Sequence, residues 1–341
     1  KKLAPHLVLF TLAMEAEVRL FDPAWARDDI PDLFQAARAN DVLGRMNPNH
    51  PLCALLISRE ALYFLETWQL ESAEDKGQEA YKKFSQYQGQ RRASNLYFRS
   101  RQFMALAYHF LGKSQEAQQE FEGLLAFIDD LLNSDEIANQ EKPQWQRLQP
   151  NLLGRLGDVL LFGQGDASNA AEVLKKAAEK ARRFEGGPKA AYLARILFKL
   201  AAAEALAGDL ESAKKSQAKA LQIAATVNQP PQEILFQRFQ EVASALLVDP
   251  KLRGQAMAEV VRGATNDDDN FVSRDRDDLQ LLLFACDFVL AEASRQPELV
   301  DDEQHNYIEK QKEELSKRVG SDGQAFLDNI TQAARTLLSA H

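Results

Sequence analysis

The chain has 341 residues, of which 45% are hydrophobic and 27% charged, so it has enough apolar material for a large core and we do not expect disorder. Its formal net charge of −9 argues against sequence-independent nucleic-acid binding, which needs a basic face for counterion release. The longest apolar runs, residues 7–14 and 279–289, are shorter than the roughly 20 residues that span a bilayer, so we expect no membrane insertion.

The chain begins at Lys1, without Met and without the basic, apolar and small-residue segments of a signal peptide. We therefore expect a processed protein or a piece of a larger one. Its two cysteines, Cys53 and Cys286, lie in apolar helical stretches, which favours buried thiols in a reducing compartment. A single bridge between them is the alternative. These features predict a cytoplasmic location.

Residues 1–50 are predicted to form an atypical helical cap, because the end of a repeat array must cover an apolar face that no neighbouring repeat hides. The large apolar residues available for this are Phe10, Leu12, Leu20, Phe21, Trp25 and Phe34.

Beyond the cap, stretches rich in Ala, Leu, Gln, Glu and Lys alternate with helix breakers, and β-branched alternation is almost absent. This composition predicts helices of roughly 15 to 22 residues and an all-α fold. The breakers are residues 47–51, Gly112, residues 163–165, residues 186–188, Gly208, residues 230–231 and Pro250.

An internal repeat organises residues 52–228. In the clearest copy, Ala105 is followed by the turn glycine Gly112 and then by Ala117, twelve residues after Ala105. The four copies start from Ala61, Ala105, Gly157 and Ala201. Their turn positions are Trp68, Gly112, Gly165 and Gly208, and the third copy has one extra residue in the turn.

The physical reason for this pattern is the close approach of two antiparallel helices, which requires small residues where the helices touch. Tyr108 and Phe121 would fill the wider gap beside such a contact. The turn glycine would supply the left-handed backbone that ends the first helix. Asp166 and Asp209 suit the N-cap region of the second helix.

This pattern resembles the signature of tetratricopeptide repeats, which consists of a small residue, an aromatic residue, a turn glycine and paired alanines. The resemblance covers slightly more than half of the chain. Turn positions are 44, 53 and 43 residues apart, against 34 in that family, which resembles its long-helix branch. The resemblance implies an α-solenoid, a right-handed superhelix of antiparallel hairpins. The 53-residue interval contains a polar insertion, residues 133–143, which we expect to be an exposed loop.

The rest of the chain fits the repeat less well. Residues 232–264 predict a fifth hairpin interrupted at Asp249 and Pro250, and residues 271–340 predict two or three closing helices. We therefore divide one continuous solenoid into residues 1–50, 51–228 and 229–341.

The acidic run at residues 267–270 does not fit a calcium loop, because Val272 and Asp278 stand where that loop needs Gly and Glu. We expect a solvated loop before a helix capped by Ser273, with Asp275 in its first turn.

No chemical motif stands out. None of the five histidines has a second ligand at metal-binding spacing, and the glycines at 154–165 lack the context of a phosphate loop. Neither cysteine has an evident histidine base. We therefore expect no metal, no cofactor and no enzymatic activity.

Cations recur on the first helices of the hairpins. We call the small residues that start the four copies, Ala61, Ala105, Gly157 and Ala201, the anchors. The residues two positions before the anchors are Arg59, Phe103, Arg155 and Lys199. The residues six positions before them are Leu55, Arg99, Asn151 and Arg195. One interpretation is a basic band that binds an acidic peptide or a carboxylate. The other is that these cations pair with Glu and Asp of neighbouring helices. The predicted groove residues are Arg59, Arg99, Phe103, His109, Asn151, Arg155, Arg195 and Lys199.

Apolar residues lie on or beside the same surface, as anchors for a partner helix or as ordinary core. They are Leu62, Leu106, Phe110, Leu161, Phe162 and Phe198. These patterns predict an interaction scaffold whose concave groove binds a peptide or helix of another protein. The alternative is a ligand- or peptide-sensing regulatory domain of a larger signalling protein.

Overall fold

The computed structural model describes residues 5–21, 29–39, 50–85, 91–135, 137–184, 190–226, 233–266, 276–297 and 300–339. All regular structure in these ranges is helical, which confirms the all-α prediction. Several predicted features lie outside the described residues: Trp25, the breakers at residues 47–49, 186–188 and 230–231, the acidic run 267–270, Val272, Ser273 and Asp275.

The chain forms two compact units, residues 1–139 and 140–341. The boundary between them falls in the predicted insertion.

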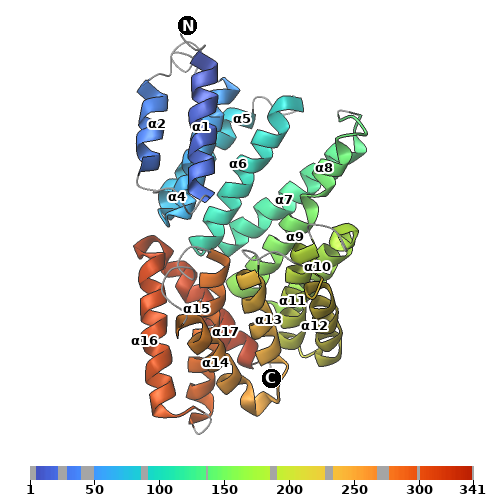
Figure 1. Cartoon of the computed structure of the whole chain (residues 1–341), viewed down its shortest axis with the longest axis vertical. Helices are drawn as coiled ribbons and strands as arrows, with labels where there is room; N and C mark the ends of the chain where they lie inside the picture. The colour runs from blue at the N-terminus through green and yellow to red at the C-terminus, as the bar shows by residue number, and fades with distance from the viewer. Residues whose placement is uncertain are drawn as a thin grey trace. The chain divides into compact units, whose positions relative to one another are not determined.

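In its described residues, the first unit contains two hairpins preceded by two helices (Figure 1). Helix α1 packs on α2 and α4, α4 pairs with α5, and α6 packs on both before pairing with α7. These helices are α1 (Pro5–Phe21), α2 (Ile30–Ala39), α4 (Pro51–Glu66), α5 (Leu70–Ser85), α6 (Arg91–Phe110) and α7 (Ser114–Asn133). The predicted cap region therefore does form helices that cover α4.

The second unit begins with two further hairpins, α9 with α10 and α11 with α12. The predicted fifth hairpin is α13 with α14, interrupted at Pro250 as expected, and three closing helices follow. The helices are α8 (Lys142–Gln146), α9 (Gln149–Asp158), α10 (Ala167–Ala181), α11 (Ala190–Leu206), α12 (Leu210–Ala224), α13 (Glu233–Leu246), α14 (Arg253–Asn266), α15 (Arg276–Arg295), α16 (Asp302–Val319) and α17 (Gln324–Ser339).

The four predicted turn positions share one backbone conformation. Gly112, Gly165 and Gly208 have positive φ, and Trp68, the residue that replaces glycine, also has a φ of 60°. After Trp68, the amide of Gln69 donates to the carbonyl of Phe64, five residues back, which is the hydrogen bond of a Schellman motif. The same bond joins Lys113 to Tyr108 and Asp209 to Glu204. The predicted turn register is therefore confirmed.

The extra residue in the third turn is absorbed by a π-helix, η2 (Val159–Gly163), at the end of α9. Here the corresponding hydrogen bond, from the amide of Asp166 to the carbonyl of Leu160, spans six residues instead of five. A π-bulge accommodates one inserted residue without breaking the helix. Beyond it, the Asp166 carboxylate accepts from the amide of Asn169, and the Asp209 carboxylate from that of Ser212, so both N-cap predictions are confirmed.

The small anchor residues lie where the helices of a hairpin meet. Ala61, Ala105 and Ala201 are fully buried. At Gly157, an added Cβ atom would lie 2.7 Å from Cγ of Leu174 on α10, so only glycine fits without movement of the partner side chain. The predicted burial is confirmed at all four anchors, and the predicted contact with the second helix is confirmed at Gly157.

Helix α15 is buried on all sides. Every residue from Asp277 to Val289 is buried, and the helix packs against α13, α14, α16 and α17. Cys286 lies within it at 0% exposure, Cys53 in α4 is 6% exposed, and both thiols are free, as predicted.

The predicted insertion is only partly an exposed loop. Helix α7 continues to Asn133, and the short helix α8 begins at Lys142. Asp135 and residues 138–140 are exposed, but Ile137 is buried, so this residue does not behave as part of a solvated loop.

Candidate partner-binding site

The eight predicted groove residues fall into two groups, one in each unit. Arg59, Arg99, Phe103 and His109 belong to the first unit, and Asn151, Arg155, Arg195 and Lys199 to the second. Arg59, His109 and Lys199 are only 3–5% exposed. These three side chains therefore do not line an open surface, contrary to expectation, because they are buried in the packing of their own unit.

In the first unit, one carboxylate joins two arginines. Nη2 of Arg59, on α4, lies 2.7 Å from Oε2 of Glu17, on α1. Nη1 of Arg99, on α6, donates to Oε1 of the same glutamate over 3.2 Å. The Arg59 side chain is 4% exposed, whereas that of Arg99 is 42% exposed. The pair thus extends from the interior of the unit to its surface.

Arg59 is incompletely satisfied in this arrangement. Its Nε and Nη1 atoms are buried and have no hydrogen-bond partner among the residues that the structure describes. Burial lowers the pKa of its guanidinium, Glu17 opposes that shift, and the positive charge of Arg99 adds to it. The guanidinium nevertheless stays protonated, because arginine is not deprotonated in proteins.

The surroundings of the arginine pair are largely apolar. Phe103, one turn after Arg99 on α6, packs against a cluster that includes Ala13, Ala16 and Phe34 of α1 and α2. His109 lies further along α6, and its ring centroid is 5.0 Å from that of Phe110, with the two ring planes tilted by 54°.

An apolar stripe on α1 remains accessible within the first unit. Phe10 is 46% and Val18 58% exposed, and Met14 between them is partly exposed. Residues four apart share one side of a helix, so these three form a continuous stripe. Phe10 and Met14 lie seven and three residues before Glu17, on the same side of α1.

In the second unit, Asp277 on α15 lies between two arginines, as Glu17 does in the first unit. It forms an ion pair with Arg155 of α9, and its Oδ2 lies 3.8 Å from Nη1 of Arg195 on α11. Burial alone would raise the pKa of Asp277, but Arg155, Lys199 and Arg195 outweigh it and hold that pKa well below its usual range. Arg195 also lies 5.2 Å from the ring centroid of Tyr192.

Lys199 has its own carboxylate. Its Nζ donates to both oxygens of Asp158, at 2.7 and 2.6 Å, and both residues are buried. Burial raises the pKa of Asp158 and lowers that of Lys199, and the attraction between the two charges opposes both shifts. Lys199 also lies 4.8 Å from the ring centroid of Phe239. Its cation is therefore part of the interior of the unit.

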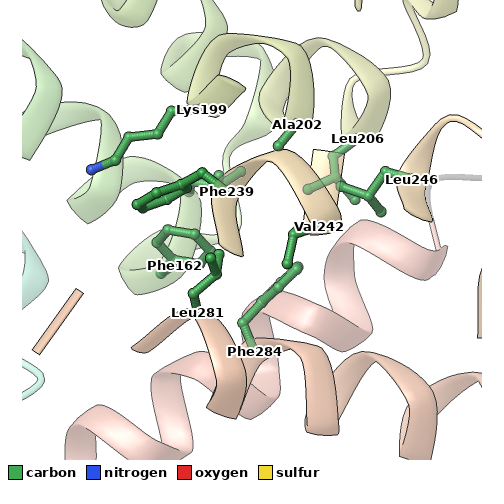
Figure 2. A pocket seen from close by; sticks show the side chains of 10 residues that line it. Phe162, Lys199, Ala202, Leu206, Phe239, Val242, Leu246, Leu281 and Phe284 are labelled. Carbon is green, nitrogen blue, oxygen red and sulfur yellow. The ribbon is translucent and has the colours of Figure 1, made fainter. Parts of the chain in front are cut away.

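Next to Lys199, the π-helix η2 and helices α11, α13 and α15 enclose an apolar core. Figure 2 shows Phe162, Phe239 and Phe284 converging with aliphatic side chains, with Lys199 at the margin. The cavity left between them has a volume of about 10 Å³, at the lower limit for one water molecule. Leu161, Phe162 and Phe198 are thus core residues, and so are Leu62, Leu106 and Phe110 in the first unit.

The two clusters occupy equivalent positions in the repeat. Arg59 and Arg155 stand two residues before the anchor of one repeat, and Arg99 and Arg195 stand six residues before the anchor of the next. Their carboxylate partners were not identified from the sequence. The available signal was an acidic residue beside an otherwise apolar helical run, as at Asp277 before residues 279–289 and Asp158 before residues 159–162.

Asn151 is partly buried on α9, one turn before Arg155. Within the described ranges, no group of three or more His, Cys, Asp or Glu side chains could hold a metal ion. No helix of the described part of the chain has an apolar stretch long enough to cross a membrane.

A scan against protein-family models finds no match to this chain, and a search of curated proteins finds none either. The resemblance to tetratricopeptide repeats therefore remains a prediction from the repeat pattern.

Proposed function

We propose that this protein is an interaction scaffold, an α-solenoid of tetratricopeptide-like hairpins that binds a helix or peptide of a partner protein. The observation that carries this proposal is the hairpin repeat itself, with its four left-handed turn positions and buried small anchors. Stacked hairpins generate extended surfaces suited to binding chains of other proteins. The step from fold to function is an analogy with other repeat proteins.

The surface that best suits a partner is in the first unit, around Arg99. Arg99 is the most exposed of the predicted cations, and Phe103 beside it is partly exposed. The stripe of Phe10, Met14 and Val18 supplies apolar area. A partly exposed arginine among apolar side chains is typical of the residues that dominate protein interfaces.

In the second unit, the corresponding cations have a structural role. Arg155 and Arg195 face Asp277 on a helix that is buried on all sides, and Lys199 faces Asp158. A ligand-sensing role has less support here, because the cavity beside Lys199 has room for about one water molecule.

Affinity capture tests the proposal. The full chain, immobilised, is exposed to an extract of its source cells, and the retained proteins are identified by mass spectrometry. We expect Arg99→Glu to lose a specific partner that wild type retains. Arg262→Glu is the matched control, because Arg262 is equally exposed at 42% and also pairs with a glutamate on its own surface. Equal capture by wild type and Arg99→Glu would contradict this surface as the site.

A further inference from the structure

The arginine pair of the first unit differs from its counterpart in the balance of charges. Arg59 and Arg99 share one carboxylate, Glu17. In the second unit, Arg155, Arg195 and Lys199 have two, Asp158 and Asp277. Among the described residues, Nε and Nη1 of Arg59 are buried donors without acceptors, and Oε2 of the neighbouring Glu17 is a buried oxygen without a hydrogen-bond donor. Buried donors of a charged group are costly unless an acceptor satisfies them.

The two clusters also differ in how far they are shielded from solvent. Asp277 begins a stretch of α15, residues 277–289, in which every residue is buried, so its arginines have a permanent partner. Glu17 belongs to α1, which keeps an exposed apolar stripe on the side that carries the glutamate. Arg99 itself is 42% exposed. Of the two arginines, Arg99 is therefore the one that an incoming group can reach from solvent.

We propose that Arg99, beside the buried pair of Arg59 and Glu17, forms a binding site for a second carboxylate, supplied by an Asp or Glu side chain on an amphipathic helix of the partner. This inference rests on the proposed function and names the chemistry of its ligand. The carboxylate would accept from Arg99, next to Glu17 and Arg59, as arginine forks bind carboxylates elsewhere. The apolar face of the partner helix would cover the stripe of Phe10, Met14 and Val18.

The binding of a small carboxylate can be measured on the full chain by nuclear magnetic resonance. The probe signal is the Nε–Hε resonance of Arg59, identified by its loss in Arg59→Lys. Sodium acetate, sodium phosphate and sodium chloride are added in separate titrations at constant ionic strength. We expect acetate to produce a saturable shift and chloride to produce none. A linear shift, or the same shift with chloride, would overturn the proposal.

Two variants separate a binding role from a structural one. Glu17→Gln removes the competing internal carboxylate and should tighten acetate binding by about tenfold, whereas Arg99→Gln should weaken it by a similar factor. Weaker acetate binding in Glu17→Gln would show that Glu17 only holds the helices together. Arg262→Gln should leave the acetate titration unchanged, and circular dichroism confirms that each variant is folded.

Peptides then test the class of partner. The probes are two 17-residue helical peptides with one apolar face, identical except for a central Glu or Gln. We expect the Glu peptide to bind wild type about tenfold more tightly, and Arg99→Gln to abolish the difference. Equal binding of the two peptides would overturn the carboxylate assignment. Phosphate binding more than about tenfold tighter than acetate would overturn it in favour of a phosphorylated ligand.

Failure of this inference is distinguishable from failure of the proposed function. If Arg99→Glu loses a captured partner but carboxylates do not move the Arg59 signal, partner binding stands and the carboxylate site is wrong. If acetate and the Glu peptide bind as expected but capture is unaffected by Arg99→Glu, the site stands and the scaffold function at this surface is wrong.

Discussion

One carboxylate joins two arginines from different hairpins in each unit, Glu17 in the first and Asp277 in the second. The cations were predictable from the sequence, because they recur at fixed offsets from the small anchors. Their partners were not, because Glu17 and Asp277 lie far from them along the chain, and tertiary packing brings them together. Of the two interpretations of the basic band, the pairing with acidic residues of other helices describes the observed contacts.

Trp68 shows how far a local pattern predicts backbone geometry. It stands where the repeat needs glycine, and it adopts the left-handed conformation despite its side chain. Such a conformation costs a non-glycine residue about 1 kcal/mol or more. Its ring contacts that of Phe110 on α6, with centroids 5.3 Å apart, and this aromatic contact offsets the cost. The sequence predicted the turn but not this contact between hairpins.

Enlarging the anchor Gly157 tests the close approach within a hairpin. Gly157→Ala should lower the free energy of unfolding by about 1–2 kcal/mol, because the new methyl group overlaps Leu174 and the overlap outweighs the gain in helix propensity. Urea denaturation followed by circular dichroism measures the change.

Gly263 on α14 is the matched control for Gly157. An added Cβ atom there meets nothing within 4 Å, so Gly263→Ala should raise the free energy of unfolding by up to about 1 kcal/mol. A Gly157→Ala protein as stable as Gly263→Ala would show that the hairpin does not need the small residue.

At the scale of helices, the hairpins, their turns and their N-caps followed from the spacing of Ala, Gly and Asp. The sequence did not indicate the role of α15. Its apolar run was recognised as core, but an apolar run alone does not indicate which elements surround it. In the structure it brings Asp277 to Arg155 and Arg195, so the face on which these cations lie is covered by the chain itself.

The ion pairs of α15 predict a pH dependence. The pKa of Asp277 is held below its ordinary value in the folded state, so its ionised form stabilises the fold above about pH 4, and this contribution is lost as the pH falls further. Asp277→Asn should therefore cost about 3 kcal/mol at pH 7, because it removes the negative charge that Arg155 and Arg195 share. The difference from wild type should shrink below about pH 4.

Unfolding free energies measured by urea denaturation at pH 7, 5 and 3.5 check this prediction. Asp328→Asn, at an exposed position of α17, should change stability by less than about 0.5 kcal/mol at each pH. A constant difference between wild type and Asp277→Asn down to pH 3.5 would contradict the assigned role of the ionised carboxylate. The pKa of Asp158 shifts the other way, since burial raises it; the charge of Asp277 adds to that shift, so Asp277→Asn removes this part of it.

At the scale of the whole chain, the two compact units each contain hairpins with the same turn geometry and the same register of paired arginines. The sequence predicted a repeat across residues 52–228, but the boundary between the units lies inside that region, at the polar insertion. Local spacing determines hairpins well, because each hairpin is stabilised by contacts between neighbours in sequence. The grouping of hairpins depends on side chains that meet across long sequence separations, such as Arg155 and Asp277.

Each unit contains one buried cysteine, so thiol labelling can report on the two units separately. Cys286 is fully buried in α15, and burial raises the pKa of its thiol to about 12. Cys53 lies in the first turn of α4 and is 6% exposed. Because only an exposed thiolate reacts, Cys286 should label only when the second unit opens, and Cys53 should label faster through fraying of its helix terminus.

Mass spectrometry after labelling with a maleimide, in single-cysteine variants Cys53→Ser and Cys286→Ala, measures both rates. In native buffer we expect Cys286 to react at least about a hundredfold more slowly than an unfolded chain, with a rate that rises with urea as the second unit unfolds. Rapid labelling of Cys286 without denaturant would mean that α15 leaves its surroundings under native conditions. The arginines of the second unit would then lose their internal partner as readily as those of the first, and the distinction between a structural and a binding arginine pair would fail.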